Sequence, residues 1–175
     1  MIKIGPNSIL VLIDVQKGTS DPVWGRRNNP GSEKSMKNVL DNFRNSGLPV
    51  IHIRQEVPMS LFRKGKPTFD FKGEVRPEEG EIIITKNASN AFMGTNLEEL
   101  IREYGDPMVF YAWLLIDRCV STTVRMSEDL GFKSYLLGDC CAAYDLKDEN
   151  GNTIPVEIVH TGAFSDIVYW NDIEF

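Results

Sequence analysis

Short apolar runs recur along the chain at roughly regular intervals. They are nearly continuous in apolar residues instead of alternating with polar ones, which is typical of strands covered on both faces of a sheet. The runs span residues 9–13, 49–54, 82–85, 108–116 and 133–138. The pattern predicts buried strands of a parallel sheet.

Segments with helical spacing lie between these runs. Residues 30–47 place apolar side chains three or four positions apart, with a proline near the start and a glycine at the end. Asp117 is a suitable N-cap for a helix that stops before Gly131. The predicted helices span residues 30–47, 95–104, 117–130 and 155–168. Strands that alternate with helices indicate a doubly wound sheet in a three-layer α/β/α fold.

Length, charge and cysteine content narrow the class of protein. The 175 residues suffice for one domain, 1–175, and are short for two. A net charge of −6 and a pI near 5.0 argue against nucleic acid or an anionic membrane as the main partner. We see neither a run of membrane-spanning length nor a signal peptide. Three cysteines, of which Cys140 and Cys141 are adjacent, make a poor disulfide framework, so we expect a cytoplasmic protein.

Three polar residues follow apolar runs. Asp14 comes directly after 9–13, Lys86 directly after 82–85, and Cys119 shortly after 108–116. The carboxyl ends of parallel strands meet at one edge of a sheet, where such folds place their binding crevice. A carboxylate, an ammonium and a thiol at this edge would form a nucleophile with a base and an electrostatic partner.

The position of Cys119 in the first turn of the predicted helix bears on its reactivity. The N-terminal end of a helix carries a partial positive charge, which lowers the pKa of a thiol. The sequence therefore predicts a thiol that ionises readily. The alternative is a structural Lys–Asp pair beside an inert, buried cysteine.

The surroundings of these residues resemble a known family. The stretches ILVLIDVQKG, ITKNASNAFMGTNLEELIREYG and IDRCVSTTVRMSEDLGF are similar, in order and spacing, to the signature regions of the isochorismatase-like cysteine hydrolases. GRRNNPGSE and LLGDCCAAYD also look like members of that superfamily, which includes nicotinamidases, N-carbamoylsarcosine amidases and ureidoacrylate amidases. STTVRM with the RRNNPG loop looks most like its streptothricin-hydrolase-like branch. The resemblance implies a six-stranded, mostly parallel sheet and an Asp14–Lys86–Cys119 triad.

The resemblance also implies a mechanism and a set of contacts. It implies hydrolysis of a C–N bond in a small amide, ureide or lactam through a thioester, without a cofactor, by a homodimer or homotetramer. The backbone N–H groups of Ile116 and Cys119 are expected to hold the oxyanion, beside a cis peptide bond between Leu115 and Ile116. The side chains expected to contact the substrate are Gln16, Trp24, Phe92 and Leu115.

Two long loops carry aromatic residues that suit the walls of a pocket. One runs over residues 17–31 and contains Trp24; the other runs over residues 55–80 and contains Phe62, Phe69 and Phe71. Long loops in compact domains are usually functional or disordered. The alternative is that these aromatic side chains only pin the loops to the body of the protein.

Some positions depart from the family pattern or argue against other chemistry. Trp113 and Ile116 stand where relatives commonly have Gly and Thr. The metal-binding Asp-x-His set of nicotinamidases is missing, and His52 and His160 are interpreted as structural, so we expect no metal.

Three other functions stay open: hydrolysis of a vinyl ether, a non-catalytic binding protein that keeps the fold, and a redox-sensing thiol protein. Isochorismatases proper lack the cysteine, so Cys119 speaks against the first.

Overall fold

A six-stranded parallel sheet forms the centre of the molecule. The computed structural model describes residues 1–156 and 167–175. The strands of the sheet are β2 (Ile9–Ile13), β3 (Val50–Gln55), β4 (Ile82–Lys86), β5 (Met108–Trp113), β6 (Lys133–Leu137) and β9 (Ile167–Val168). Their order is β4-β3-β2-β5-β6-β9, and every neighbouring pair is parallel. The predicted doubly wound α/β fold is confirmed.

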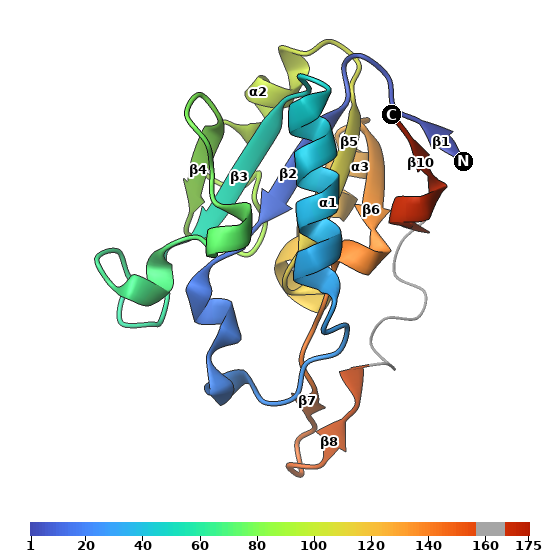
Figure 1. The fold of residues 1–175 in the computed structure, drawn as a ribbon. Helices are drawn as coiled ribbons and strands as arrows, with labels where there is room; N and C mark the ends of the chain where they lie inside the picture. Colours follow the sequence, from blue (N-terminus) through green and yellow to red (C-terminus); the bar gives the residue numbers. More distant parts are fainter. Residues whose placement is uncertain (157–166) are drawn as a thin grey trace.

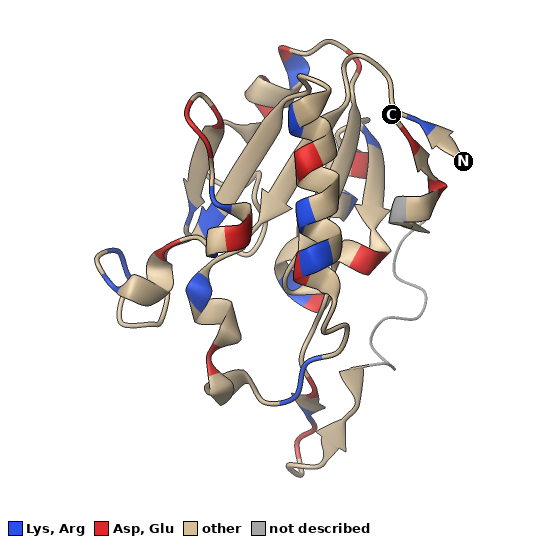
Figure 2. Cartoon of the chain, viewed as in Figure 1, with Lys and Arg blue, Asp and Glu red and all other residues tan. Residues whose placement is uncertain are grey.

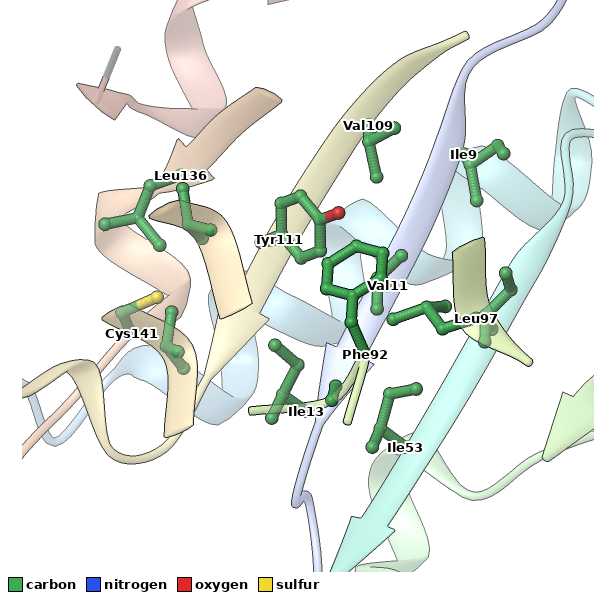
Figure 3. Close-up of a cluster of buried hydrophobic side chains, with 14 of the residues drawn as sticks. Ile9, Val11, Ile13, Ile53, Phe92, Leu97, Val109, Tyr111, Leu136 and Cys141 are labelled. Atoms are coloured by element: carbon green, nitrogen blue, oxygen red, sulfur yellow. The ribbon is translucent and has the colours of Figure 1, made fainter. Parts of the chain in front are cut away.

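Helices cover both faces of this sheet (Figure 1). Helix α1 (Ser32–Asn45) packs on one face, and α2 (Leu97–Arg102) and α3 (Ser121–Asp129) pack on the other. Successive side chains of a strand point to opposite faces. In β2, Ile9, Val11 and Ile13 therefore join the cluster under α2 and α3, part of which Figure 3 shows, while Leu10 and Leu12 join the cluster under α1.

The charge pattern agrees with this layering. Strands β2 and β5 contain no charged residue, and charged residues gather on helices and loops (Figure 2). All five residues of β2 are buried, as expected for a strand at the centre of a covered sheet. Among the described residues, no helix is long and apolar enough to cross a membrane.

Smaller elements complete the described chain. Strands β1 (Ile2–Lys3) and β10 (Ile173–Glu174) pair in parallel near the two termini, and β7 (Leu146–Lys147) forms an antiparallel hairpin with β8 (Thr153–Ile154). Single turns of 3-10 helix are η1 (Lys17–Ser20), η2 (Pro22–Trp24), η3 (Pro67–Phe69), η4 (Gly73–Val75), η6 (Gly138–Cys140) and η7 (Trp170–Asp172). Several of these turns lie in the two loops that the sequence singles out.

The structure differs from the sequence predictions at two helices. The helix predicted from Asp117 begins as the π-helical turn η5 (Ile116–Val120), and its α-helical part starts only at Ser121. Asp117 is thus inside the turn and is not its N-cap, because the wide turn closes with a hydrogen bond from Val120 N–H to Leu115 O at 3.2 Å.

The predicted helix 155–168 falls mostly on residues 157–166, which lie outside the described residues. Its last two residues are wrong as a helix, because Ile167 and Val168 form β9. This strand extends the sheet by pairing with Leu136 and Leu137 of β6.

Glu81, just before β4, ties three elements together. Its carboxylate accepts hydrogen bonds from Arg44 of α1 at 2.7 and 2.8 Å and from the Glu78 backbone N–H at 2.8 Å, and lies 2.8 Å from His52 Nε2 of β3. Burial alone would raise the pKa of Glu81, but these partners outweigh it and lower the pKa to about 2. Burial lowers the pKa of His52, so its ring is neutral at pH 7 and donates to Glu81. His52 is structural, as predicted.

The first prediction concerns this carboxylate. Glu81→Gln should lower the free energy of unfolding by about 1–3 kcal/mol at pH 7, because it removes charged hydrogen bonds. A group whose pKa is lower in the folded state stabilises it above its unfolded pKa, near 4.5 for Glu, and loses that effect as the pH falls toward 2. Urea unfolding at a series of pH values should show the gap between wild type and variant shrinking below about pH 4.5.

The control is Glu79→Gln, which changes an exposed neighbouring carboxylate. It should leave the free energy of unfolding within about 0.5 kcal/mol of the wild type. A Glu81→Gln effect that does not change with pH would contradict the proposed role of the charge.

Candidate active site

Asp14 lies at the carboxyl end of the central strand. It follows Ile13 directly, its backbone N–H donates to Ile53 O at 2.8 Å, and its side chain is almost completely buried. Its φ of +58° places it in the left-handed region, which Asp tolerates better than most residues. The chain turns sharply here, so the carboxylate is held at the sheet edge where the strands end.

Lys86 is the last residue of β4 and reaches the same edge. Its side chain is fully buried, and its Nζ lies 2.8 Å from Asp14 Oδ2. The ammonium also donates to Gln55 Oε1 and to Ala88 O, the latter at 3.2 Å. An ammonium has three donors, so every one of them has an acceptor. The structure brings Asp14 and Lys86 together as the sequence predicts.

The carboxyl group of Asp14 is under two opposing influences. Burial raises its pKa above the ordinary 3.8, while the charge and hydrogen bond of Lys86 and the nearby thiol of Cys119 oppose that rise. Among the described residues, Asp14 Oδ1 has no partner that meets hydrogen-bond geometry. The result is a carboxylate with one oxygen fixed by the ammonium and one available to take a proton.

Cys119 sits in η5, partly exposed, and interacts with both members of this pair. Burial raises the pKa of its thiol to about 12; the negative charge of Asp14 adds to the rise and Lys86 opposes it. The prediction of a readily ionising thiol is therefore wrong. The residue lies in a π-helical turn. Desolvation and the Asp14 carboxylate raise the pKa of the thiol by more than the positive charge of Lys86 lowers it.

The backbone around Cys119 differs from the expectation in two details. The N–H of Ile116 donates to Ala142 O at 3.3 Å, so it is already used and is not free to hold an oxyanion. The cis peptide bond joins Leu114 to Leu115, one bond earlier than predicted. Leu115 and Cys119 both line the cavity described next, so their N–H groups replace that of Ile116 as the candidate oxyanion donors.

A cavity opens beside the triad. It encloses about 350 Å³, open space at its mouth included. Its lining consists of Asp14, Thr19, Trp24, Gln55, Phe62, Leu114, Leu115, Cys119 and Tyr144. Of the predicted substrate contacts, the structure places Trp24 and Leu115 in this lining, together with Phe62 of the second loop.

The other two predicted contacts do not reach the cavity lining. Gln16 is fully buried, and its Nε2 donates to Gln55 O at 3.1 Å and to Phe69 O at 2.8 Å. Phe92 is packed in the core, where its ring stacks on Phe132 with centroids 6.3 Å apart. Both residues follow a triad residue closely in sequence, but their side chains turn into the protein.

Sequence reasoning missed Thr19, Gln55 and Tyr144 in the lining. Gln55 carried a usable signal, because it is a polar residue at the end of an apolar strand, as Lys86 is. Tyr144 stacks on Trp24 with ring centroids 6.0 Å apart, and Phe62 lies on Trp24 at 6.2 Å. The contact between Tyr144 and Trp24 joins segments more than 100 residues apart, so no local sequence pattern indicates it.

Trp113 lies behind the site and does not line the cavity. It is fully buried, with Lys72 Nζ 4.7 Å and Arg27 Cζ 5.3 Å from its ring centroid. Its φ of +125° is a conformation that favours glycine, the residue that the family pattern has here. The large ring is part of the core and does not form part of the cavity wall.

No metal centre is evident in the part of the chain that the structure describes. Residues 1–156 and 167–175 contain no group of three or more His, Cys, Asp or Glu side chains that could hold an ion. His160 lies outside these residues. That the site works without a metal stays a prediction.

Comparisons of sequence and of structure with known proteins match this chain to the same family. A family model for the isochorismatase domain matches residues 8–154. The isochorismatase family protein YrdC of Bacillus subtilis (strain 168) is 39% identical over 153 residues, which are 86% of this chain and 82% of YrdC. An isochorismatase-family protein from Chromobacterium violaceum has a crystal structure with a TM-score of 0.90 and 35% identity, covering 98% of this chain and 94% of that one. Streptothricin hydrolase of Streptomyces noursei is 25% identical over 158 residues, 87% of this chain and 62% of that protein.

The second prediction follows from the thiol environment. Iodoacetamide should modify Cys119 before Cys140 and Cys141, because only Cys119 is partly exposed. Its rate should keep rising between about pH 7 and pH 10, because the thiolate fraction is small below the pKa. Lys86→Met should slow the reaction at a given pH, since it removes the charge that lowers the pKa of the thiol. Peptide mapping by mass spectrometry gives the rate for each thiol.

Lys34→Met, which removes an exposed lysine of α1, is the matched control and should not change the rate. A rate that is already constant near pH 7 would mean that a thiolate forms without substrate. Faster labelling of Cys140 or Cys141 would contradict the assigned accessibility.

Proposed function

Because this chain belongs to the isochorismatase family, we propose that it is a cysteine hydrolase that cleaves the C–N bond of a small amide, ureide or lactam. The observation that carries the proposal is the buried Lys86–Asp14 pair beside the Cys119 thiol, at the wall of a cavity. A base, a nucleophile and a fixed positive charge in one place are what acyl transfer through a thioester needs. The streptothricin hydrolase relative supports an amide-type substrate.

The proton on Cys119 moves when the substrate is attacked. Because burial raises the pKa of the thiol, the resting residue is neutral. Asp14 accepts the thiol proton as sulfur forms a bond to the carbonyl carbon, and the C=O electron pair moves to oxygen. The N–H groups of Leu115 and Cys119 would then hold the oxyanion.

Collapse of the tetrahedral intermediate breaks the C–N bond. Asp14 returns the proton to the leaving nitrogen, which departs as ammonia or an amine and leaves a thioester on Cys119. A water molecule, deprotonated by Asp14, then attacks the thioester carbonyl. The C–S bond breaks, Asp14 gives the proton to the sulfur, and the acid and the neutral thiol are released. Asp14 thus serves as base and acid in turn, and no net proton is gained or lost by the enzyme.

Lys86 supports the proton transfers of Asp14 by its charge and does not donate its own proton. Its ammonium stabilises the Asp14 carboxylate in a buried place where a lone carboxylate would take up a proton. The hydrogen bonds to Gln55 and Ala88 prevent Lys86 from moving away. Lys86 is therefore assigned as an electrostatic partner of the base and the thiol.

The lining supports a small substrate with a flat or apolar acyl group. The lining includes the aromatic side chains of Trp24, Phe62 and Tyr144, and Leu114 and Leu115 add aliphatic surface. Aromatic side chains that are held in place bind flat groups by stacking on them.

A non-catalytic role for the fold rested on the replacements at Trp113 and Ile116. Neither residue belongs to the cavity lining. The triad beside the cavity is complete, so the observations favour a catalyst.

The third prediction tests the triad with a panel of primary amides, ureides and lactams, assayed by ammonia release or chromatography. Cys119→Ala should abolish turnover of any substrate found, and Asp14→Asn should reduce it by about 10²–10⁴-fold, the usual effect of losing general acid–base catalysis. Because only ionised Asp14 can accept a proton, kcat/KM should fall on the acid side with an apparent pKa above 3.8.

Cys140→Ala is the matched control, because this buried thiol is not part of the cavity lining. It should keep activity within a few-fold of the wild type, and all variants should be compared by their thermal midpoints. Turnover by Cys119→Ala at the wild-type rate would overturn the proposed function.

A further inference from the structure

Most polar side chains of the cavity lining already have their hydrogens committed within the protein. Trp24 Nε1 donates to Gly18 O at 2.8 Å, the hydroxyl of Tyr144 donates to Thr19 O, and Thr19 Oγ1 donates to Gln16 O at 2.6 Å. All three acceptors are backbone carbonyl oxygens of the segment that leads into and through η1. Bonds of this kind fix the cavity wall and leave these side chains without a donor for a ligand.

Gln55 is different, and its orientation follows from chemistry. Its Oε1 accepts a hydrogen bond from Lys86 Nζ. An ammonium can only donate, so the atom facing Lys86 must be the carbonyl oxygen and the NH₂ group must point elsewhere. Among the described residues, no hydrogen-bond partner of Gln55 Nε2 is found, and Gln55 lines the cavity.

The backbone of Gln55 is also held in place. Its N–H donates to Gln16 Oε1 at 2.8 Å and its C=O accepts from Gln16 Nε2 at 3.1 Å, so one buried side chain binds both backbone groups. With Lys86 at its carbonyl oxygen as well, Gln55 has little freedom to turn its NH₂ group away. A donor fixed in this way lowers the entropic cost of binding an acceptor.

We propose that Gln55 is a specificity-determining residue: its NH₂ group donates to an acceptor oxygen or nitrogen on an uncharged acyl group of the substrate. The proposal rests on the proposed function, whose site it deepens. Among the described residues, the lining contains no Lys or Arg, and it contains the Asp14 carboxylate. An acidic acyl group would therefore meet a repelling charge in the lining and no cation there. The substrate class is then a small neutral amide with a second polar atom in its acyl part.

The test uses matched pairs of primary amides in which an ether oxygen replaces a methylene, such as methoxyacetamide and butanamide. Equilibrium binding is measured by NMR titration of the Cys119→Ala protein, so that the result does not depend on turnover. The ether member of a pair should bind several-fold to about tenfold more tightly, the usual net effect of one hydrogen bond.

The Cys119→Ala, Gln55→Glu protein should lose this preference, because a carboxylate still accepts from Lys86 but has no N–H to offer. Gln55→Met in the same background removes the donor without adding charge and should lose it too. Thr122→Val in the same background, which changes an exposed threonine of α3 outside the cavity lining, should keep the preference. The ratio within each pair is the readout, so a general loss of affinity cancels.

Equal binding of both members by the Cys119→Ala protein, or an unchanged ratio after the Gln55 substitutions, would overturn the inference. Turnover assays on the same pairs keep the two proposals apart. Cys119-dependent turnover with equal binding of ether and methylene amides contradicts the role of Gln55 alone. Selective binding without any Cys119-dependent turnover contradicts the proposed function alone.

Discussion

The site depends on a buried ion pair between the ends of two strands that are not neighbours. Lys86 of β4 reaches Asp14 after β2 across the end of β3. Burying two charges is costly unless their remaining hydrogen-bonding groups are satisfied. The carbonyl oxygens of Gln55 and Ala88 supply the remaining partners of the ammonium, and Gln16 holds Gln55 in turn. The order of the strands and the residues at their ends therefore decide whether the pair can exist.

The burial of this ion pair also affects the pKa and the reactivity of the Cys119 thiol. The low-polarity surroundings that strengthen the attraction between Asp14 and Lys86 also raise the pKa of Cys119. A nucleophile kept as a neutral thiol is less open to oxidation and alkylation than a free thiolate. In the proposed mechanism, the negative charge that develops on sulfur during attack passes to the substrate oxygen, while the proton moves to Asp14. Under this proposal the thiol reacts with a bound amide in preference to solutes in general, and a neutral thiol also argues against a redox sensor.

The sequence predicts those parts of the fold and site that follow from regular geometry. Apolar runs place Asp14 and Lys86 at strand ends, and parallel strands place both ends at one edge. The π-helical turn was not predictable, because one extra residue per turn leaves no mark in a hydrophobic pattern. That shift moves Asp117 away from the capping position and leaves the Ile116 N–H bonded to Ala142.

Side-chain direction is the other part that the sequence leaves open. Gln16 and Phe92 lie close in sequence to Asp14 and Lys86, yet they point into the protein, while Tyr144 arrives from a distant segment to stack on Trp24. Proximity along the chain is a poor guide to a cavity wall that is built from several loops. The rule that located Lys86 would also have located Gln55, since both residues are polar and end strands of the sheet.

The central claim is that Cys119 carries the acyl group, and the most direct measurement is mass spectrometry of protein quenched in acid during turnover of an amide substrate. We expect an added mass equal to the acyl group on the peptide that contains Cys119. Hydroxylamine should remove this mass and yield the acyl hydroxamate. An acyl group on any other residue, or hydroxamate formation at an undiminished rate by Cys119→Ala, would contradict it.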